Sequence, residues 1–153
     1  MSTRSPGNPQ RVARYVLWFY TLLTAFFGVV TFIDPVRLAA TVDISLLTAI
    51  ARIDFVATYG GSVVGVAALL AYCALHPERV RLGLTATAFY YASYALPRGI
   101  GMMLTHGQMG PNAYTLYTLF AIESSGAVIS FWMARKMRDF KELSPSRPST
   151  HTV

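Results

Sequence analysis

Charged residues are scarce in this chain, and cysteine is nearly absent. Only 13% of the 153 residues are Asp, Glu, Lys or Arg, about half of the share that soluble globular proteins carry. The single cysteine, Cys73, cannot form a disulfide within the chain, which excludes a disulfide-stabilised secreted miniprotein. Hydrophobic residues make up 54%, which excludes a disordered polar chain and argues against a soluble enzyme. We therefore expect an integral membrane protein.

The sequence also lacks the common signatures of catalytic and metal sites. It has no phosphate-binding glycine loop, no serine nucleophile elbow and no CxxC pair. His76 and His106 fall in predicted turns and His151 in the C-terminal tail, so no two histidines can meet within a membrane. We therefore expect no metal, no haem and no other cofactor.

Four long apolar runs make up most of the chain. Each is about as long as the roughly 20 helical residues that cross a 30 Å hydrocarbon core. A backbone in lipid must satisfy its own hydrogen bonds, and the runs lack the alternation of barrel strands, so they predict helices. The expected fold is an all-α integral membrane four-helix bundle with spans at residues 15–33, 56–75, 82–104 and 113–134.

The distribution of basic residues predicts the orientation in the membrane. Most of the 13 Lys and Arg residues lie in the N-terminal tail, the second connection and the C-terminal segment, which a four-span chain places on one side. Both termini are therefore expected in the cytoplasm, with the protein in the inner (plasma) membrane. The net charge of +6 then reflects topology and not nucleic-acid binding. A flexible tail (1–10), a transmembrane domain (11–137) and a basic tail (138–153) are the expected parts.

The second span predicts a helix that starts before the apolar run and a close contact within it. Ser45–Asp54 predicts a capped helix that continues into this span. Within the span, Gly61 and Gly65 lie one helical turn apart, which predicts a close contact with a neighbouring helix through small residues.

Two charges inside the spans indicate the position of a candidate site. A charge within a span costs roughly 2.5–3.5 kcal/mol on insertion scales, so it needs a partner or a function. Glu123 lies about ten residues, or 15 Å, from the outer end of its helix, and Arg98 lies about six residues, or 9 Å, from the outer end of the preceding helix. Since these helices are antiparallel neighbours, we expect an Arg98–Glu123 contact, with Asp54 as a third member.

Tyrosines near this contact predict a pocket. Tyr90, Tyr91 and Tyr94 lie deeper than the tyrosines at the span ends, which fit an interfacial belt. They and Arg98 are candidate binding residues of a polar pocket between the second, third and fourth helices, and Glu123 and Asp54 are candidate acids. Alternatively, the Arg98–Glu123 pair only holds two helices together.

Two motifs resemble a known family. Asp54–Gly61, with the sequence Asp-Phe-Val-Ala-Thr-Tyr-Gly-Gly, is similar to the acidic-x-Arg-Ala-x-Tyr-Gly-Gly signature of small four-span bacterial proteins catalogued as domain of unknown function number 4345. The segment from Arg98 to Gly107, followed by a mid-helix Glu123, resembles its second motif. The chain departs from the signature at Val56, where the family has arginine, so Arg52 would have to substitute. The resemblance covers residues 15–134 and implies no reaction, because the family has none assigned. It marks as important Asp54, Tyr59, Arg98 and Glu123, so Tyr59 is a further candidate binding residue of the pocket.

Several functions are compatible with these features. The first is a non-enzymatic protein that binds a lipophilic small molecule, or an accessory subunit of a membrane complex. The alternative is a cofactor-independent enzyme in which protonated Glu123 or Asp54 starts the cyclisation, isomerisation or hydrolysis of an apolar alkene or epoxide, as in terpene cyclases. A proton-coupled transporter would need an oligomer, because the chain has four spans and no repeat. The expected partners are the lipid bilayer, a lipophilic molecule, and further copies or another membrane protein.

Overall fold

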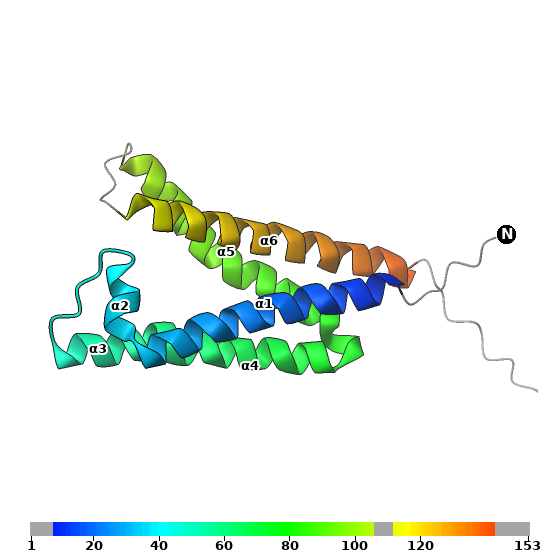
Figure 1. Ribbon diagram of the computed structural model, residues 1–153. Helices are drawn as coiled ribbons and strands as arrows, with labels where there is room; N and C mark the ends of the chain where they lie inside the picture. The colour runs from blue at the N-terminus through cyan, green and yellow to red at the C-terminus, as the bar shows by residue number, and fades with distance from the viewer. Residues whose placement is uncertain (1–7, 106–111, 143–153) are drawn as a thin grey trace, which may run out of the picture.

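The computed structural model describes residues 8–105 and 112–142, which form helices joined by short connections, with no strand among them (Figure 1). The expected all-α fold is confirmed. The elements are α1 (Asn8–Ile33), α2 (Pro35–Ala40), α3 (Ala49–Phe55), the π-helix η1 (Val56–Gly61), α4 (Ser62–Leu75), the 3-10 helix η2 (Pro77–Arg79), α5 (Val80–Leu104) and α6 (Ala113–Glu142).

The first breaks between helices fall where the sequence has capping residues and proline. Asp34 follows α1 and caps α2, because its side chain accepts a hydrogen bond from the Arg37 backbone N–H at 3.0 Å. Pro35 lies in the first turn of α2, where its missing N–H costs no helical hydrogen bond. After α4, Pro77 likewise lies in the first turn of η2, but the preceding His76 makes no side-chain capping hydrogen bond.

The elements α3, η1 and α4 run end to end as one long helix (Figure 1). Thr48 caps this helix by accepting a hydrogen bond from the Ala51 N–H at 3.1 Å. The sequence predicted a helix that begins directly after Ser45. In the structure the helix begins at Ala49. Its π-helical turn coincides with the Tyr-Gly-Gly motif, and such turns inside longer helices are frequent at functional sites.

The long helices pack as two pairs, α1 with α4 and α5 with α6. Near the N-terminal end of α1 both pairs share one apolar core. Figure 1 shows the pairs diverging toward the opposite end, where α2 and α3 lie. The divergence leaves room between the pairs. The buried residues of the shared core are Ala13, Leu17, Leu70, Cys73, Ala74, Val80, Leu84, Met133 and Ala134.

Three helical segments are long and apolar enough to cross a membrane: Gln10–Ile33, Ala49–Leu75 and Ala113–Arg138. This agrees with a membrane protein. Helix α5 has 25 residues, but Arg81, Arg98 and many hydroxyl-bearing residues lower its hydropathy, and it falls outside this group. The crossing by α5, and hence the count of four spans, stays a prediction.

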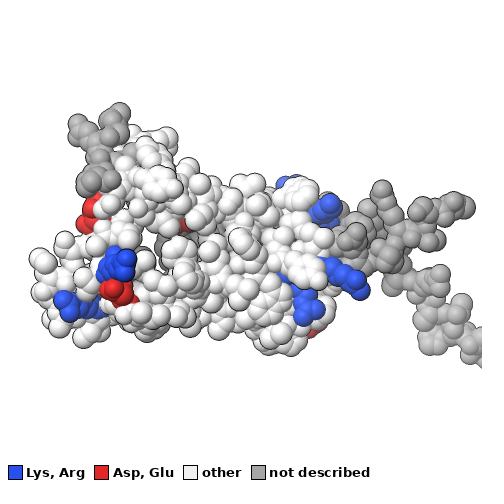
Figure 2. Space-filling view, viewed as in Figure 1, with Lys and Arg blue, Asp and Glu red and all other residues white. Residues whose placement is uncertain are grey.

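The described charges gather at the two ends of the molecule, and the surface between them is almost free of charge (Figure 2). One end carries the start of α1, η2, the start of α5 and the last turns of α6, with a single described acidic side chain, Glu78. The other end carries Asp34, Arg37, Asp43, Arg52 and Asp54. The basic side chains described at the first end are Arg11, Arg14, Arg79, Arg81, Arg135, Lys136 and Arg138. The tails expected at residues 1–10 and 138–153 lie mostly outside the described residues.

Candidate functional site

Arg98 and Glu123 form a two-point ion pair between α5 and α6. Arg98 Nε donates to Glu123 Oε2 at 2.9 Å, and Arg98 Nη2 donates to Glu123 Oε1 at 2.9 Å. The side chains are only 21% and 11% exposed. Such paired hydrogen bonds between a guanidinium and a carboxylate are stronger than neutral ones and fix both planes. The contact expected from the depths of the two residues is confirmed.

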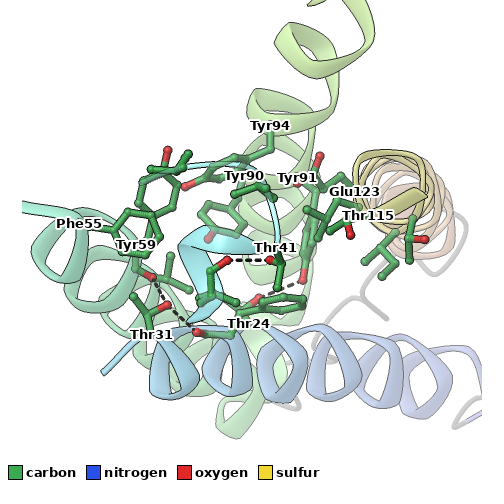
Figure 3. Close-up of a pocket in the computed structure, with 18 of the residues that line it drawn as sticks. Thr24, Thr31, Thr41, Phe55, Tyr59, Tyr90, Tyr91, Tyr94, Thr115 and Glu123 are labelled. Atoms are coloured by element: carbon green, nitrogen blue, oxygen red, sulfur yellow. Dashed lines mark hydrogen bonds between the residues drawn. The ribbon is translucent and has the colours of Figure 1, made fainter. Parts of the chain in front are cut away.

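A cavity of about 420 Å³ lies between the diverging helix pairs and includes Glu123 in its wall (Figure 3). α1, η1, α5 and α6 each contribute to the wall, and α2 with its following loop closes one side. Its volume falls within the roughly 300–1,000 Å³ of small-molecule sites. The lining side chains are mostly aromatic, aliphatic and hydroxyl-bearing: Thr24, Phe27, Thr31, Leu38, Thr41, Val42, Ile44, Phe55, Tyr59, Val63, Tyr90, Tyr91, Tyr94, Tyr114, Thr115, Thr118, Leu119, Ile122 and Glu123.

Most of the sequence-predicted site residues meet in this cavity. Tyr59 from η1, Tyr90, Tyr91 and Tyr94 from α5, and Glu123 from α6 all line it (Figure 3). Arg98 does not line the cavity and is linked to it only through Glu123. The structure thus brings the predicted residues together, while their roles stay predictions.

Asp54 does not join this group. Its side chain is exposed on α3, it does not line the cavity, and it forms no ion pair with any described residue. The expectation of Asp54 as a third member of the Arg98–Glu123 contact is therefore wrong. The π-helical turn that follows Asp54 changes the rotational phase of α3 relative to α4. Counting residues with α-helical spacing therefore predicts the wrong direction for the Asp54 side chain.

The sequence analysis missed the contribution of α1. Thr24 and Thr31 line the cavity from this helix, whereas the pocket was expected between the second, third and fourth helices only. Thr24 Oγ1 donates to the Tyr20 carbonyl at 2.7 Å, so at 3.0 Å it accepts from the Tyr91 hydroxyl. The single Thr31 hydroxyl proton can be donated to the Phe27 carbonyl, 2.9 Å from Oγ1, or to the Tyr59 carbonyl, 3.3 Å away. The only sequence signal was a seven-residue spacing of the two threonines, which places them on one helix face.

Tight packing of aromatic rings closes the cavity toward the basic end. The Tyr91 ring stacks edge-on against Tyr20, with centroids 5.3 Å apart, and against Tyr90, with centroids 5.4 Å apart. Gly126 of α6 permits this arrangement, because a Cβ at this position would lie 2.9 Å from Tyr91 Cγ. The floor of the cavity is therefore closely packed.

The loop after α2 covers part of the cavity at the opposite end. Asn112, just before α6, donates to Asp43 Oδ1 at 2.6 Å and to the Ala40 carbonyl at 3.3 Å. These bonds connect the start of α6 to the segment that supplies Leu38, Thr41, Val42 and Ile44 to the wall. The loop is thus continuous with α2 and is connected by these hydrogen bonds to the start of α6.

Gly61 and Gly65 do not form the predicted helix contact. A Cβ at Gly65 would meet no described atom within 4 Å, and a Cβ at Gly61 would meet only the Val56 carbonyl, at 4.0 Å. The close approaches occur at other glycines. Gly28 packs against Val64, and Gly83 packs against both Cys73 and Leu17.

Among residues 8–105 and 112–142, no group of three His, Cys, Asp or Glu side chains is placed to hold a metal ion. His76 Nδ1 lies 2.8 Å from the Tyr72 carbonyl in the turn after α4. His106 and His151 lie outside the described residues.

The fold and the cavity define a helical protein with membrane-spanning character and a partly open, largely apolar cavity that a few hydroxyl-bearing residues also line. Residues 12–134 match the family described as domain of unknown function (DUF4345), and the chain belongs to this family. The family expected from the two motifs is confirmed. No curated protein and no solved structure matches the chain.

Proposed function

We propose that this protein binds a lipophilic small molecule in the cavity between its two helix pairs. The observation that carries the proposal is the cavity itself, about 420 Å³ in volume, with aromatic and aliphatic walls and a set of hydroxyl groups. Apolar walls with a few placed polar groups are typical of small-molecule sites. The favoured ligand has an apolar body and one hydroxyl or carbonyl group.

The charge state of the wall supports a neutral ligand. Glu123 is the one carboxylate among the lining residues, and both of its oxygens accept hydrogen bonds from Arg98. The pair leaves no uncompensated charge to attract an ion. Hydroxyl groups such as those of Tyr59 and Thr115 can both donate and accept hydrogen bonds, which suits a hydroxyl or carbonyl group on the ligand.

The same ion pair argues against the enzymatic alternative. Acid-initiated cyclisation or epoxide opening needs a protonated carboxyl directed at the substrate. Both oxygens of Glu123 accept hydrogen bonds from Arg98, so neither oxygen is free to direct a proton at a substrate, and the second candidate acid, Asp54, lies away from the cavity. Binding without chemistry is therefore the function we propose.

We further propose four membrane crossings with both termini in the cytoplasm of an inner-membrane protein. The excess of basic side chains at the end that holds the start of α1 and the last turns of α6 supports this orientation. Residues 11–137 would form the membrane domain, flanked by the two tails.

Photolabelling tests the binding proposal. The probe is a ten-carbon alcohol that carries a diazirine, added to the full-length protein in lipid nanodiscs. Labelling of the wild type should saturate and should be competed by unlabelled decanol. Leu119→Trp fills the cavity from α6 and should reduce the competed labelling about tenfold, which corresponds to about 1.4 kcal/mol of binding free energy.

Ile129→Trp serves as the matched control. Ile129 lies on the same helix, is 41% exposed and does not line the cavity, so its replacement should leave the competed labelling unchanged. Equal labelling of Leu119→Trp and the wild type, with both variants folded by circular dichroism, would refute the proposal.

A further inference from the structure

A second cavity lies between α5 and α6 at the basic end of the molecule. It measures about 350 Å³ and shares no lining residue with the cavity between the two helix pairs. No acidic side chain is among its described lining residues, which together carry a positive charge. These residues are Arg81, Thr85, Phe131, Ala134, Arg135 and Arg138.

Two of the arginines are available to an anion. Arg81 in the first turn of α5 and Arg135 on α6 have exposed side chains and form no ion pair with any described residue. The guanidinium group presents its N–H donors in a planar fork that matches two oxygens of a phosphate. Arginines of two helices facing one cavity can therefore bind a single phosphate together.

Exposed apolar residues continue from this cavity along the same helix faces. On α6, Val128 and Phe131 precede Arg135 at helical spacing and are 67% and 55% exposed. On α5, Phe89 lies two turns from Arg81 on the same side and is 71% exposed. A bound molecule would thus meet cations at the end of the helices and an apolar surface toward their middle.

We propose that this cavity binds the phosphate of an anionic phospholipid, whose acyl chains lie along Phe131, Val128 and Phe89. The cations lie where membrane-spanning helices meet the headgroup region, and basic pockets between such helices suit anionic headgroups. A soluble phosphate would use the arginines but not the apolar faces, so the combination favours a lipid.

Native mass spectrometry of the full-length protein in detergent tests the site. The probes are phosphatidylglycerol and phosphatidylcholine with identical acyl chains. The wild type should retain phosphatidylglycerol in preference to phosphatidylcholine. Arg81→Gln with Arg135→Gln should weaken phosphatidylglycerol binding by roughly tenfold or more, because both cations next to the phosphate are lost.

The matched control removes the same charge from the same end. Arg11→Gln with Arg14→Gln changes two arginines on α1 that do not line the cavity, and it should weaken phosphatidylglycerol binding by less than about threefold. Equal weakening by both double variants would overturn the proposal, because general surface charge would then explain it. Displacement of the lipid by millimolar inorganic phosphate would also overturn it in favour of a soluble ligand.

A third variant keeps the test independent of folding. Arg81→Lys with Arg135→Lys retains both charges and loses the planar forks, and it should weaken phosphatidylglycerol binding several-fold. Binding equal to the wild type in this folded variant would show that no defined phosphate site exists there.

Discussion

The Arg98–Glu123 ion pair holds a carboxylate in the cavity wall. Arg98 approaches Glu123 from the neighbouring helix, and each carboxylate oxygen receives one N–H group at 2.9 Å. A carboxylate without this partner would lie largely desolvated among apolar side chains, which is costly. The pair therefore stabilises the α5–α6 contact whatever the cavity binds.

A double-mutant cycle measures this stabilisation. Arg98→Ala should lower the free energy of unfolding by about 2 kcal/mol, because it leaves Glu123 without its partner. Arg98→Ala combined with Glu123→Ala should recover part of the loss, since no uncompensated charge remains. Unfolding of the protein from mixed micelles by sodium dodecyl sulfate provides the measurement. Losses that simply add would contradict a direct interaction.

Sequence alone could predict this contact but not the position of Asp54. Arg98 and Glu123 lie on antiparallel helices joined by a short connection, and their depths in the two helices follow from counting residues. The direction of Asp54 depends on the π-helical turn η1, which no spacing in the sequence reveals. The sequence analysis missed Thr24 and Thr31. A neutral side chain in an apolar helix, unlike a charge, has no large free-energy cost that would predict an interaction partner.

Among the helices, glycine decides how closely α4, α5 and α1 approach. Gly83 of α5 faces α4 and α1, and a Cβ there would lie 2.7 Å from both Cys73 Cβ and Leu17 Cδ2. The predicted contact at Gly61 and Gly65 is absent from the described helices. A glycine pattern shows that a close approach is possible, but the partner is decided by how the helices rotate about their axes.

A pair of alanine substitutions tests this packing. Gly83→Ala should destabilise the protein by about 1–3 kcal/mol, because the new methyl group overlaps atoms of two helices. Gly65→Ala should be neutral or stabilising by up to about 1 kcal/mol, since alanine favours a helix and meets nothing there. Both changes are compared by thermal unfolding in one detergent. A larger loss at Gly65 would indicate a partner outside this chain.

The positions of the long helices could be predicted better than their ends. Each predicted span lies within a long helix of the structure, because runs of apolar residues and their proline breaks are explicit in the sequence. α1 and α6 extend beyond the apolar runs, to Asn8 and Glu142, because a helix continues through polar residues until its backbone bonds are interrupted.

For the molecule as a whole, the distribution of charge supports a definite orientation. The basic end carries the start of α1 and the last turns of α6, so both lie at one end of the helix bundle (Figure 1). In the four-crossing proposal, a membrane across the almost uncharged middle zone is crossed by α5 as well as by the other long helices. Three crossings would place the termini on opposite sides.

Reporter fusions test this orientation. Green fluorescent protein fused after Val153 should fluoresce, and alkaline phosphatase at the same position should be inactive, because both report a cytoplasmic C-terminus. A fusion of alkaline phosphatase after Thr105 should be active. An active phosphatase after Val153 would exclude the proposed four crossings with cytoplasmic termini.

The central claim is that a lipophilic molecule binds between the two helix pairs. The most direct test is to locate the adducts of the diazirine alcohol by fragmentation mass spectrometry, with and without excess decanol. We expect the competed adducts on cavity residues, above all Tyr59, Tyr94 and Glu123. Competed adducts spread evenly over exposed residues outside the cavity, such as Phe26 and Trp132, would contradict the account.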